Sequence, residues 1–482
     1  MDEQAECPRC VELLRRIEVL ERRLGRVLHK LTEAEARVQK LQEQLAGTKK
    51  DSSNSSKPPS SDITKPPKKP SLRRRRRGGQ KGHPRHERPP FGPGDIDFLK
   101  RHAHEVCPQC GGPVEQLPAS TGQALVQVEL VEKPMLVTEH RSGSCRCHAC
   151  GQDFTQPIPP EIAAAGTFGP RLTAYVAYLK GACHASFSTI QKLLRETCGL
   201  RIARGTLVGL CQRVARSLQP HYDELLNQVR QQSLLNIDET SHRENGQWQW
   251  TWAFRAPQFT LFHIDPTRST AVLEEVLGDD FSGTIGSDYY SVYRRFLKLH
   301  PRADAQFCLA HLVRDVKFLE SLPNAVDQQF GQELLVELKE LFRLWHTPEQ
   351  FTNEAAFRAA LIAQGQQLER VATERAPDTR ASRKVARRFE KHAQHYLRFT
   401  RVQGLEPTNN AAEQAIRHVV IDRHVTQGTR SPRGRAWCER IWTIIATCRQ
   451  HGRNLLFFLE QSYRALLTDT PPPPLITALT IS

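Results

Sequence analysis

The chain lacks the features that a membrane or secreted protein needs. It contains no apolar run near the roughly 20 residues that span a bilayer, and its first residues, MDEQAE, are acidic and unlike a secretory signal. Acidic residues are also scarce: 52 Asp and Glu stand against 68 Lys and Arg, which leaves a net charge of +16. We therefore expect a cytoplasmic protein with no membrane partner, whose partner is a polyanion, nucleic acid.

Cysteine is sparse as well, with 13 residues in a chain of 482. Several of these cysteines nevertheless form C-x-x-C pairs, which in a reducing compartment indicate metal ligands before disulfide bonds. The chain is too long for one hydrophobic core, so we expect roughly two to four modules. A mean hydropathy of −0.52 suits such modules joined by polar linkers.

Residues 1–50 carry a seven-residue repeat of apolar side chains. One line of the repeat runs through Ile17, Leu24, Leu31, Val38 and Leu45, and the other through Leu13, Leu20, Val27, Ala34 and Leu41. About five heptads without a polar break predict a coiled coil. We therefore expect a homo-oligomer formed through this helix. The alternative is one long helix packed on its own domain.

Residues 51–100 are predicted to form a disordered basic linker. Most of this segment consists of Ser, Pro, Gly and cations, with almost nothing to bury. Between Lys65 and Arg88 it holds 11 Lys and Arg and one Glu, a local charge of +10. We expect it to bind DNA phosphates or enter a minor groove through Arg73, Arg74, Arg75, Arg76, Arg77 and Lys81. A solvated linker without a dedicated partner is the alternative.

Two C-x-x-C motifs, each followed by Gly, lie within residues 101–157. The first contains Cys107 and Cys110, the second contains Cys147 and Cys150, and strand-like segments at 124–131 and 134–140 lie between them. Two such knuckles around a hairpin predict a four-cysteine zinc ribbon, which is a closed and structural Zn²⁺ site. Cys145 and His148 are spare donors, so this set of four ligands is a choice.

Residues 165–225 change to a helical pattern. Helices are expected over 172–180, 186–200 and 203–218, with Ser186 or Ser188 capping the second and Gly199 ending it. This spacing suits a helix-turn-helix-like DNA-binding module whose last helix enters a major groove. Three helices with a turn are also an ordinary packing unit.

The stretch from Leu234 to Thr240 predicts a buried strand that carries Asp238 to the edge of a sheet. Residues 248–264 predict two further strands, rich in aromatic and β-branched side chains. A helix at 269–277 then precedes a short strand that runs into Asp288. Three meandering strands, a helix and a fourth strand beside the first describe an α/β ribonuclease-H-like sheet. In that topology Asp238 and Asp288 would lie within reach of one metal ion.

The predicted catalytic domain extends over residues 230–430. It continues with a fifth strand at 305–308, a basic helical insertion at about 315–403, and a helix capped by Thr408 or Asn409. The buried stripe of that helix consists of Ala412, Ile416, Val419 and Val420. This stripe places Glu413 on a flank of the helix, which is expected to cross the first and fourth strands. Residues 431–482 are expected to form a C-terminal helical segment.

Three converging acids repel one another unless cations neutralise them. All-oxygen ligation favours Mg²⁺ or Mn²⁺, and two such ions, about 3.5–4 Å apart, support phosphodiester chemistry. Each acid also has an ordinary interpretation. Glu239 could be the important acid in place of Asp238, and Asp288 could cap the next helix. Glu413 could form a surface pair with Arg417. Together, in the order strand, strand, helix, the three acids predict a catalytic site.

Several motifs in combination resemble the IS66 family of DDE transposases, which bacterial insertion sequences carry. They are SSNSSKPPSSD, RRRRRGGQKGH, the paired C-x-x-C motifs, IDET, GSDYYSVY, CLAH and TNNAAEQAIRHVVIDRH, and they cover most of the chain. The resemblance implies metal-dependent hydrolysis of a DNA strand at the ends of the element. It also implies transfer of the freed 3′-hydroxyl into target DNA.

By position, the resemblance implies that Asp238, Asp288 and Glu413 are the metal-binding triad. Supporting roles are implied for Cys308 and His311, a C-x-x-H motif, and for Asn409, Asn410 and Arg417 in the stretch around the glutamate. The implied partners are DNA, at the terminal repeats and the target, and small companion proteins of the same element. The implied location is the bacterial nucleoid. The block at 424–437 departs from the family pattern, which leaves a DNA contact there open.

Two rival functions remain. One is a catalytically silent DNA-binding regulator derived from a transposase, although all three acids and the helix that carries Glu413 are present. The other is a ribonuclease-H-fold nuclease that hydrolyses DNA without strand transfer. Nicking of a supercoiled plasmid with Mg²⁺ tests the first, and joining of a precut 3′-hydroxyl end tests the second.

Overall fold

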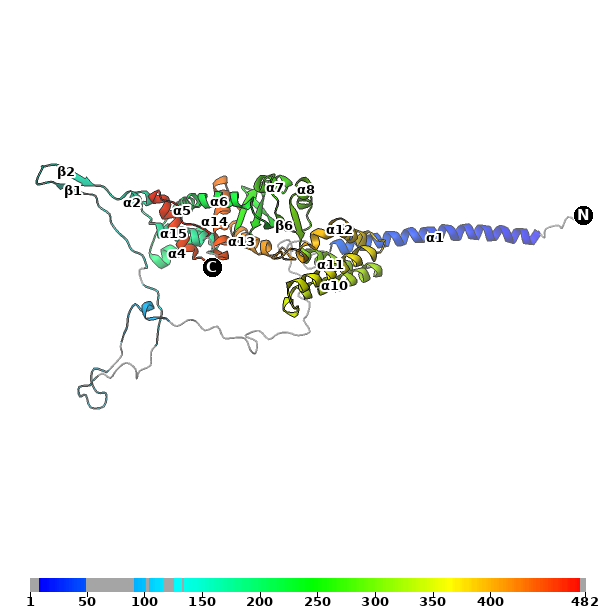
Figure 1. Cartoon of the computed structure of the whole chain (residues 1–482), viewed down its shortest axis with the longest axis horizontal. Coiled ribbons are helices and arrows are strands. Elements are labelled where there is room, and N and C mark those ends of the chain that lie inside the picture. The colour runs from blue at the N-terminus through cyan, green and yellow to red at the C-terminus, as the bar shows by residue number, and fades with distance from the viewer. Residues whose placement is uncertain (1–7, 49–90, 101–103, 116–124, 132–133, 477–482) are drawn as a thin grey trace, which may run out of the picture.

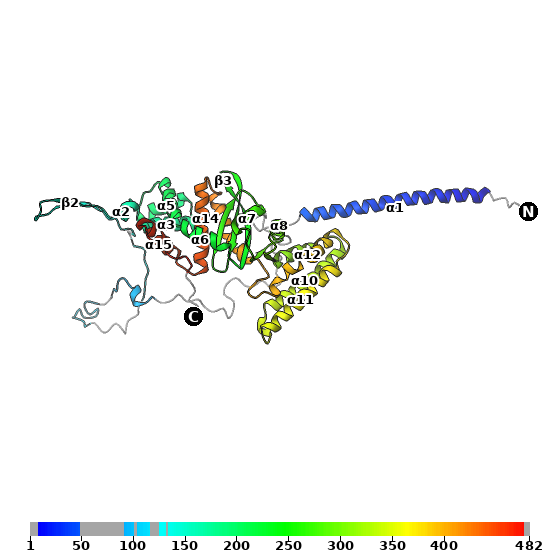
Figure 2. The ribbon, with the colours of Figure 1, turned by 45° about the horizontal axis from the view of Figure 1, so that its top comes forward.

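A computed structural model (Figure 1) describes residues 8–48, 91–100, 104–115, 125–131 and 134–476. The predicted helix at the start of the chain is present as α1 (Pro8–Thr48), a single long helix in Figure 2. Its apolar line is exposed: Leu24 and Leu31 are 59% and 53% exposed. Arg73–Arg77 and Lys81 lie outside the described residues, and a short 3-10 helix, η2 (Pro93–Asp95), lies within the predicted linker. Within the described part of the chain, no helix is both long and apolar enough to cross a membrane.

A five-stranded sheet forms the centre of the molecule. β3 (Leu234–Glu244), β4 (Gln247–Arg255) and β5 (Thr260–Asp265) form an antiparallel meander. β6 (Thr284–Ser287) runs parallel beside β3, and β7 (Asp304–Phe307) runs parallel beside β6, which gives the order β5-β4-β3-β6-β7. The strands predicted between 234 and 308 are therefore all present. This mixed α/β sheet, with its first and fourth strands adjacent, is compatible with a ribonuclease-H-like domain.

The first strand is longer than the sequence analysis predicted. β3 continues past Thr240 to Glu244 and turns into β4 through Asn245 and Gly246, whose φ angles of 47° and 80° are both positive. An Asn-Gly pair favours this two-residue hairpin turn because both residues tolerate the left-handed conformation. Side chains alternate along the strand, so Asp238 and Glu239 point to opposite faces of the sheet.

Helices cover both faces of the sheet. α7 (Thr270–Leu277) and α8 (Ser291–Leu299) pack together, and Tyr293 of α8 contacts Glu239 and Trp252 on one face. α13 (Asn410–Thr426) crosses the other face over β3 and β4. Asp238 lies on the face that α13 covers.

α14 (Pro432–Gln450) closes the edge of the sheet at β5. Three side chains on one face of α14 accept hydrogen bonds from the outward N–H groups of β5: Glu439 from Ile264 (2.8 Å), Thr443 from Phe262 (3.0 Å) and Thr447 from Thr260 (3.3 Å). The match is geometric, because four helix residues rise about 6 Å and two strand residues about 6.7 Å. The unpaired edge of β5 is thereby satisfied.

A group of helices flanks this end of the sheet. They are α2 (Pro160–Ala165), α3 (Pro170–Gly181), α4 (Phe187–Cys198), α5 (Arg204–Ser217), α6 (Gln219–Val229) and α15 (Leu455–Thr468). The three predicted helices correspond to α3, α4 and α5. Ser186 caps α4 by accepting the N–H of Thr189, and Gly199, with φ 64°, ends it. In Figure 2 the dark red α15 lies beside α3 and α5, and these helices share one hydrophobic core with the sheet and α14.

The predicted helical insertion has a core of its own. It follows α9 (Leu309–Glu320) and contains α10 (Ala325–Trp345), η4 (Pro348–Gln350), α11 (Glu354–Glu374), α12 (Arg380–Tyr396) and η5 (Arg398–Thr400). Its buried residues include Leu334, Leu361 and Phe389, which cluster with Phe307 of β7. The insertion is therefore packed onto the β7 edge of the sheet.

The hairpin expected between the two cysteine motifs was wrongly placed. Strands were predicted at 124–131 and 134–140. The structure describes residues 125–131 and 134–140, and neither range forms a strand. Leu130 and Leu136, for example, are exposed. A hairpin forms instead from β1 (Gly143–Arg146) and β2 (Asp153–Gln156), on either side of the second motif. The short turn at Cys147–Cys150 closes this hairpin locally. In the predicted strands Met135 is partly buried against the main hydrophobic core, unlike the exposed Leu130 and Leu136.

Candidate active site and metal-binding motifs

Asp238 lies within β3, and Asp288 directly follows the neighbouring strand β6. Asn236 of β3 is the register partner of Gly286 in the parallel strand β6, and each aspartate lies two residues beyond that pair. Neighbouring strands are about 4.8 Å apart, so the two residues are brought together at one end of the sheet. Asp238 accepts the N–H of Glu239 (3.0 Å), and Asp288 accepts the N–H of Tyr290 (2.9 Å).

Asn409 ties the start of α13 to β3 directly beside Asp238. It occupies the N-cap position as predicted, but its side chain does not cap the helix. Instead Nδ2 donates to the carbonyl oxygen of Ile237 (2.8 Å), and the backbone N–H donates to Sγ of Cys308 (3.2 Å). Asn409 therefore positions the helix on the strand. The neighbouring Asn410 is exposed.

Glu413 is held by α9 and not by Arg417. Its Oε1 shares a hydrogen bond of 2.8 Å with Nε2 of His311 and lies 3.5 Å from the guanidinium of Arg314. The hydrogen bond to His311 lowers the pKa of Glu413 below its ordinary value. Arg417, the predicted surface partner, is exposed. Sequence reasoning missed Arg314, although it lies three residues after His311 on the same helix and so faces the same way.

The pKa of Asp238 reflects the nearby acids. Burial raises the pKa of Asp238 well above its ordinary value, and the charges of Glu239, Asp288 and Glu413 raise it further. The ionised form of Asp238 is thus disfavoured beside the other acids, and the three carboxylates make an all-oxygen donor set, which fits hard divalent cations.

Two tighter groups of potential ligands occur among the described residues. Within each group the ligand atoms all lie within 4.8 Å of one another: one consists of Cys308, His311 and Glu413, and the other of His263, Asp265 and Glu275. Asp238 and Asp288 belong to neither group. The ligand atoms of Asp238, Asp288 and Glu413 therefore do not all lie within 4.8 Å of one another.

Glu239, the alternative acid, is fully engaged on the opposite face. Its carboxylate accepts hydrogen bonds from the guanidinium of Arg268 and from the hydroxyl of Tyr293. Its side chain is only 2% exposed. The sequence contained one signal for this arrangement, because adjacent residues of a strand face opposite ways.

The two cysteine knuckles have the same backbone geometry. In each, the first cysteine's N–H donates to the residue five positions on, and its carbonyl accepts the N–H of a glycine with positive φ, Gly111 (74°) or Gly151 (75°). Backbone N–H groups lower the pKa of Cys107 and of Cys147 below the ordinary thiol value. Among the described residues, however, no three of Cys107, Cys110, Cys147 and Cys150 come within 4.8 Å of one another.

Comparison with protein families identifies the chain. A family model described as "Transposase IS66 family" matches residues 165–436, more than half of the chain. The chain belongs to the IS66 transposase family. The matched region contains the sheet, the helical insertion and α13, so the site described above lies within the IS66 part of the chain. A second model, described as a family of unknown function (DUF6444), matches residues 4–89.

Two curated relatives from Sinorhizobium fredii (strain NBRC 101917 / NGR234) are similar over part of their length. The uncharacterized protein y4jD is 26% identical over 267 residues, 48% of this chain and 51% of the relative. The uncharacterized protein y4qI is 23% identical over 344 residues, 65% of this chain and 62% of the relative. The IS66 chain therefore matches between half and two thirds of each relative.

Proposed function

We propose that the protein is the DNA transposase of an insertion sequence. It hydrolyses a phosphodiester bond at each end of the element and transfers the freed 3′-hydroxyl into target DNA. The observation that carries the proposal is that Asp238 and Asp288 each lie two residues beyond a register pair of the adjacent strands β3 and β6, with Glu413 on the helix that crosses β3. Membership of the IS66 family supports it.

Asp238, Asp288 and Glu413 are proposed to hold two Mg²⁺ or Mn²⁺ ions. When bound, such ions activate the attacking oxygen and stabilise the leaving oxygen of a phosphodiester. The chain's own residues set the position of the acids. Asn409 fixes α13 against β3, and His311 holds the carboxylate of Glu413 on the side of α9.

The remaining modules are proposed to bind zinc, DNA and other protein chains. Cys107, Cys110, Cys147 and Cys150 would hold a structural Zn²⁺ ion, supported by the matching geometry of their knuckles. Arg73–Arg77 and Lys81 would contact DNA phosphates, as would the exposed start of α5 if it acts as a recognition helix. α1 would pair with a second copy through its exposed apolar line. Small companion proteins of the same element are further proposed partners.

Plasmid nicking tests the catalytic proposal. A supercoiled plasmid that carries the element's ends is incubated with the full chain and Mg²⁺, and nicked products are measured. Asp288→Asn should remove activity, whereas Asp279→Asn, an exposed acid at the end of α7, should keep it. Equal activity in the two variants would contradict the assignment of Asp288. Absence of nicking on every end sequence would favour the DNA-binding regulator.

Strand transfer separates a transposase from a nuclease of the same fold. A precut end with a free 3′-hydroxyl is supplied with a target plasmid, and joined products are measured. The transposase should join the end, and Glu413→Gln should not. Cleavage of intact ends without any joining from precut ends would instead identify a nuclease.

A further inference from the structure

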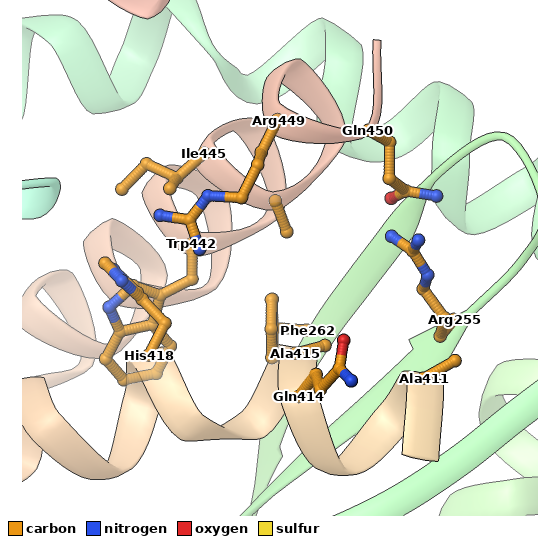
Figure 3. A pocket seen from close by; sticks show the side chains of 11 residues that line it. Arg255, Phe262, Ala411, Gln414, Ala415, His418, Trp442, Ile445, Arg449 and Gln450 are labelled. Carbon is orange, nitrogen blue, oxygen red and sulfur yellow. The ribbon is translucent and has the colours of Figure 1, made fainter. Parts of the chain in front are cut away.

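A cavity of about 260 Å³ lies between α13 and α14, over β4 and β5 (Figure 3). Its polar lining consists of Arg255, Arg449, Gln414, Gln450, His418 and the indole of Trp442. Figure 3 shows Arg255 and Gln450 near one end and Arg449 above His418 and Trp442 at the other. None of the eleven lining residues is acidic. Two arginines therefore line the cavity, and no acidic side chain among the lining residues balances their charge.

Arg255 is half-buried and Arg449 is exposed, and neither has an acidic partner among the described residues. By contrast, Arg388 is paired with Asp315 and Arg268 with Glu239. The guanidinium of Arg255 donates to the hydroxyl of Thr260 (3.0 Å), and burial lowers its pKa. A partly buried cation without a partner is costly. An anion in the cavity would remove that cost.

The neutral groups of the cavity are also suited to an anion. Burial, followed by the charges of His184 and Arg449, lowers the pKa of His418 to about 4, so its ring is neutral at pH 7. Its Nε2 lies 3.1 Å from the carbonyl oxygen of Gly181. Gln414 adds an amide donor to the two guanidinium groups, which together match the acceptor oxygens of a phosphate. The amide of Gln450 already donates to the carbonyl oxygens of Ala256 (3.1 Å) and Pro257 (3.3 Å).

The cavity lies on the same face of the sheet as Asp238. Phe262, which forms part of its floor, is the register partner of Ala253, and Ala253 is the register partner of Asp238. Two strand spacings correspond to about 10 Å, or about three nucleotides at the 3.4 Å rise of one DNA strand. Gln414, on the wall, directly follows Glu413. A strand held at the three acids therefore passes within reach of the cavity.

We propose that this cavity binds a backbone phosphate of the DNA, within about three nucleotides of the bond that is cut. Arg255 and Arg449 supply the charge, and Gln414 supplies a further donor. The inference rests on the proposed transposase function, because it takes DNA as the polyanion. It adds a contact that holds the strand in register with the acids.

Salt dependence of DNA binding tests the contact without any cleavage. Full-length wild type and the double variant Arg255→Gln/Arg449→Gln are titrated into labelled end DNA in EDTA at several salt concentrations. The slope of log K against log salt should fall by about one to two in the double variant. The control Arg343→Gln/Arg375→Gln loses the same charge from arginines already paired with Glu340 and Glu333, and should keep the slope. Arg255→Lys shows whether a loss is due to charge or to misfolding, because it should keep the wild-type slope.

Neutral linkages in the DNA locate the phosphate. Methylphosphonates are placed one at a time on either side of the cleavage site. One or two positions should weaken wild-type binding about tenfold, and the same positions should have no further effect in the double variant. Binding with equal sensitivity in both proteins overturns this inference alone, whereas no binding to any DNA overturns the proposed function as well. Stabilisation by millimolar inorganic phosphate, with no sensitive position in the DNA, would assign the cavity to a free anion and overturn the DNA assignment.

Discussion

Glu413 and His311 share a hydrogen bond of 2.8 Å although 102 residues separate them in the chain. The contact exists because the helices that carry them start at the same place. The N–H of Asn409, before α13, donates to Sγ of Cys308, before α9, and the N–H of Leu309 donates to the carbonyl oxygen of Pro407 (2.9 Å). The position of the proposed catalytic glutamate therefore depends on α9 as well as on its own helix.

Removal of this contact should impair catalysis more than DNA binding. In His311→Ala we expect the cleavage rate to fall about 10- to 100-fold, the usual effect of losing a group that orients a metal ligand. The KM for DNA should change little, and His311→Gln, which keeps a hydrogen-bonding group, should recover part of the rate. His346→Ala, at an exposed position after α10, is the control. A parallel loss of DNA affinity and rate in His311→Ala would point to a contact with DNA instead.

The same contact should also make stability depend on pH. Because His311 lowers the pKa of Glu413, the stabilisation is fully present above the ordinary glutamate pKa of about 4.3. It is lost as the pH falls through the lower pKa of the folded protein. His311→Ala should therefore lower the free energy of unfolding by about 1–2 kcal/mol near pH 7, and by less below pH 4. Urea denaturation at both pH values measures the difference, and a pH-independent effect would contradict it.

Neutralisation of Asp238 should stabilise the metal-free protein while it removes activity. The pKa of Asp238 is raised by burial and by neighbouring acids, so its ionisation destabilises the fold as the pH rises above its ordinary value of about 3.9. Asp238→Asn removes that penalty and should raise Tm at pH 7 in EDTA. Mn²⁺ should raise Tm of the wild type but not of the variant. A lower Tm for Asp238→Asn in EDTA would show that the three acids do not repel one another.

Zinc content tests the four proposed cysteine ligands. Purified wild type should contain one Zn²⁺ ion per chain by elemental analysis, and Cys110→Ser/Cys150→Ser should contain none. Each knuckle lowers the pKa of its first thiol, which favours the thiolate that zinc binds. Cys145→Ser changes the spare donor next to the second knuckle and should keep the metal. Loss of zinc in Cys145→Ser would mean that the ligand set was chosen wrongly.

Local periodic signals were enough to predict most of the secondary structure. The heptad line through Leu24 and Leu31 predicted α1, and Ser186 with Gly199 marked both ends of α4. The proximity of Asp238, in β3, and Asp288, after β6, could be predicted because strand order and register determine where each residue lies along the sheet. Each of these inferences needed only residues close together in sequence, or a topology with few alternatives.

The contacts that hold the site together could not be predicted in this way. Thr408 or Asn409 was expected to cap the helix, but Asn409 binds the carbonyl of Ile237, 172 residues earlier. Thr443 accepts a hydrogen bond from the edge of β5 across 181 residues. The sequence does not show which distant backbone group a polar side chain will hydrogen-bond, because the partner depends on how the elements pack in the folded protein. Residues 125–131 have the composition of a strand but do not form one, because no neighbouring strand pairs with them.

The exposed apolar line of α1 should make the protein self-associate. Leu24→Glu/Leu31→Glu places charges in the seam of the predicted coiled coil, where burial is unfavourable, and should convert an oligomer into a monomer. Light scattering after size-exclusion chromatography measures the mass. Arg15→Glu/Arg22→Glu changes exposed residues on the side of the helix away from the seam and should leave the oligomer intact. A monomeric wild type at micromolar concentration would contradict the prediction.

Gly428 should be among the least replaceable residues near the site, because it closes the connection between α13 and β3. Its φ is +88°, and a Cβ there would lie 2.2 Å from the carbonyl oxygen of Arg243, which already accepts the N–H of Thr429 (2.8 Å). Gly428→Ala must break that hydrogen bond or shift α13, so the free energy of unfolding should fall by about 2–4 kcal/mol. Cleavage should fall as well, since α13 carries Glu413. The control Gly205→Ala has open space at its Cβ within α5, and it should be neutral or stabilising by up to about 1 kcal/mol. Equal urea midpoints for Gly428→Ala and wild type would show that this connection does not constrain the helix.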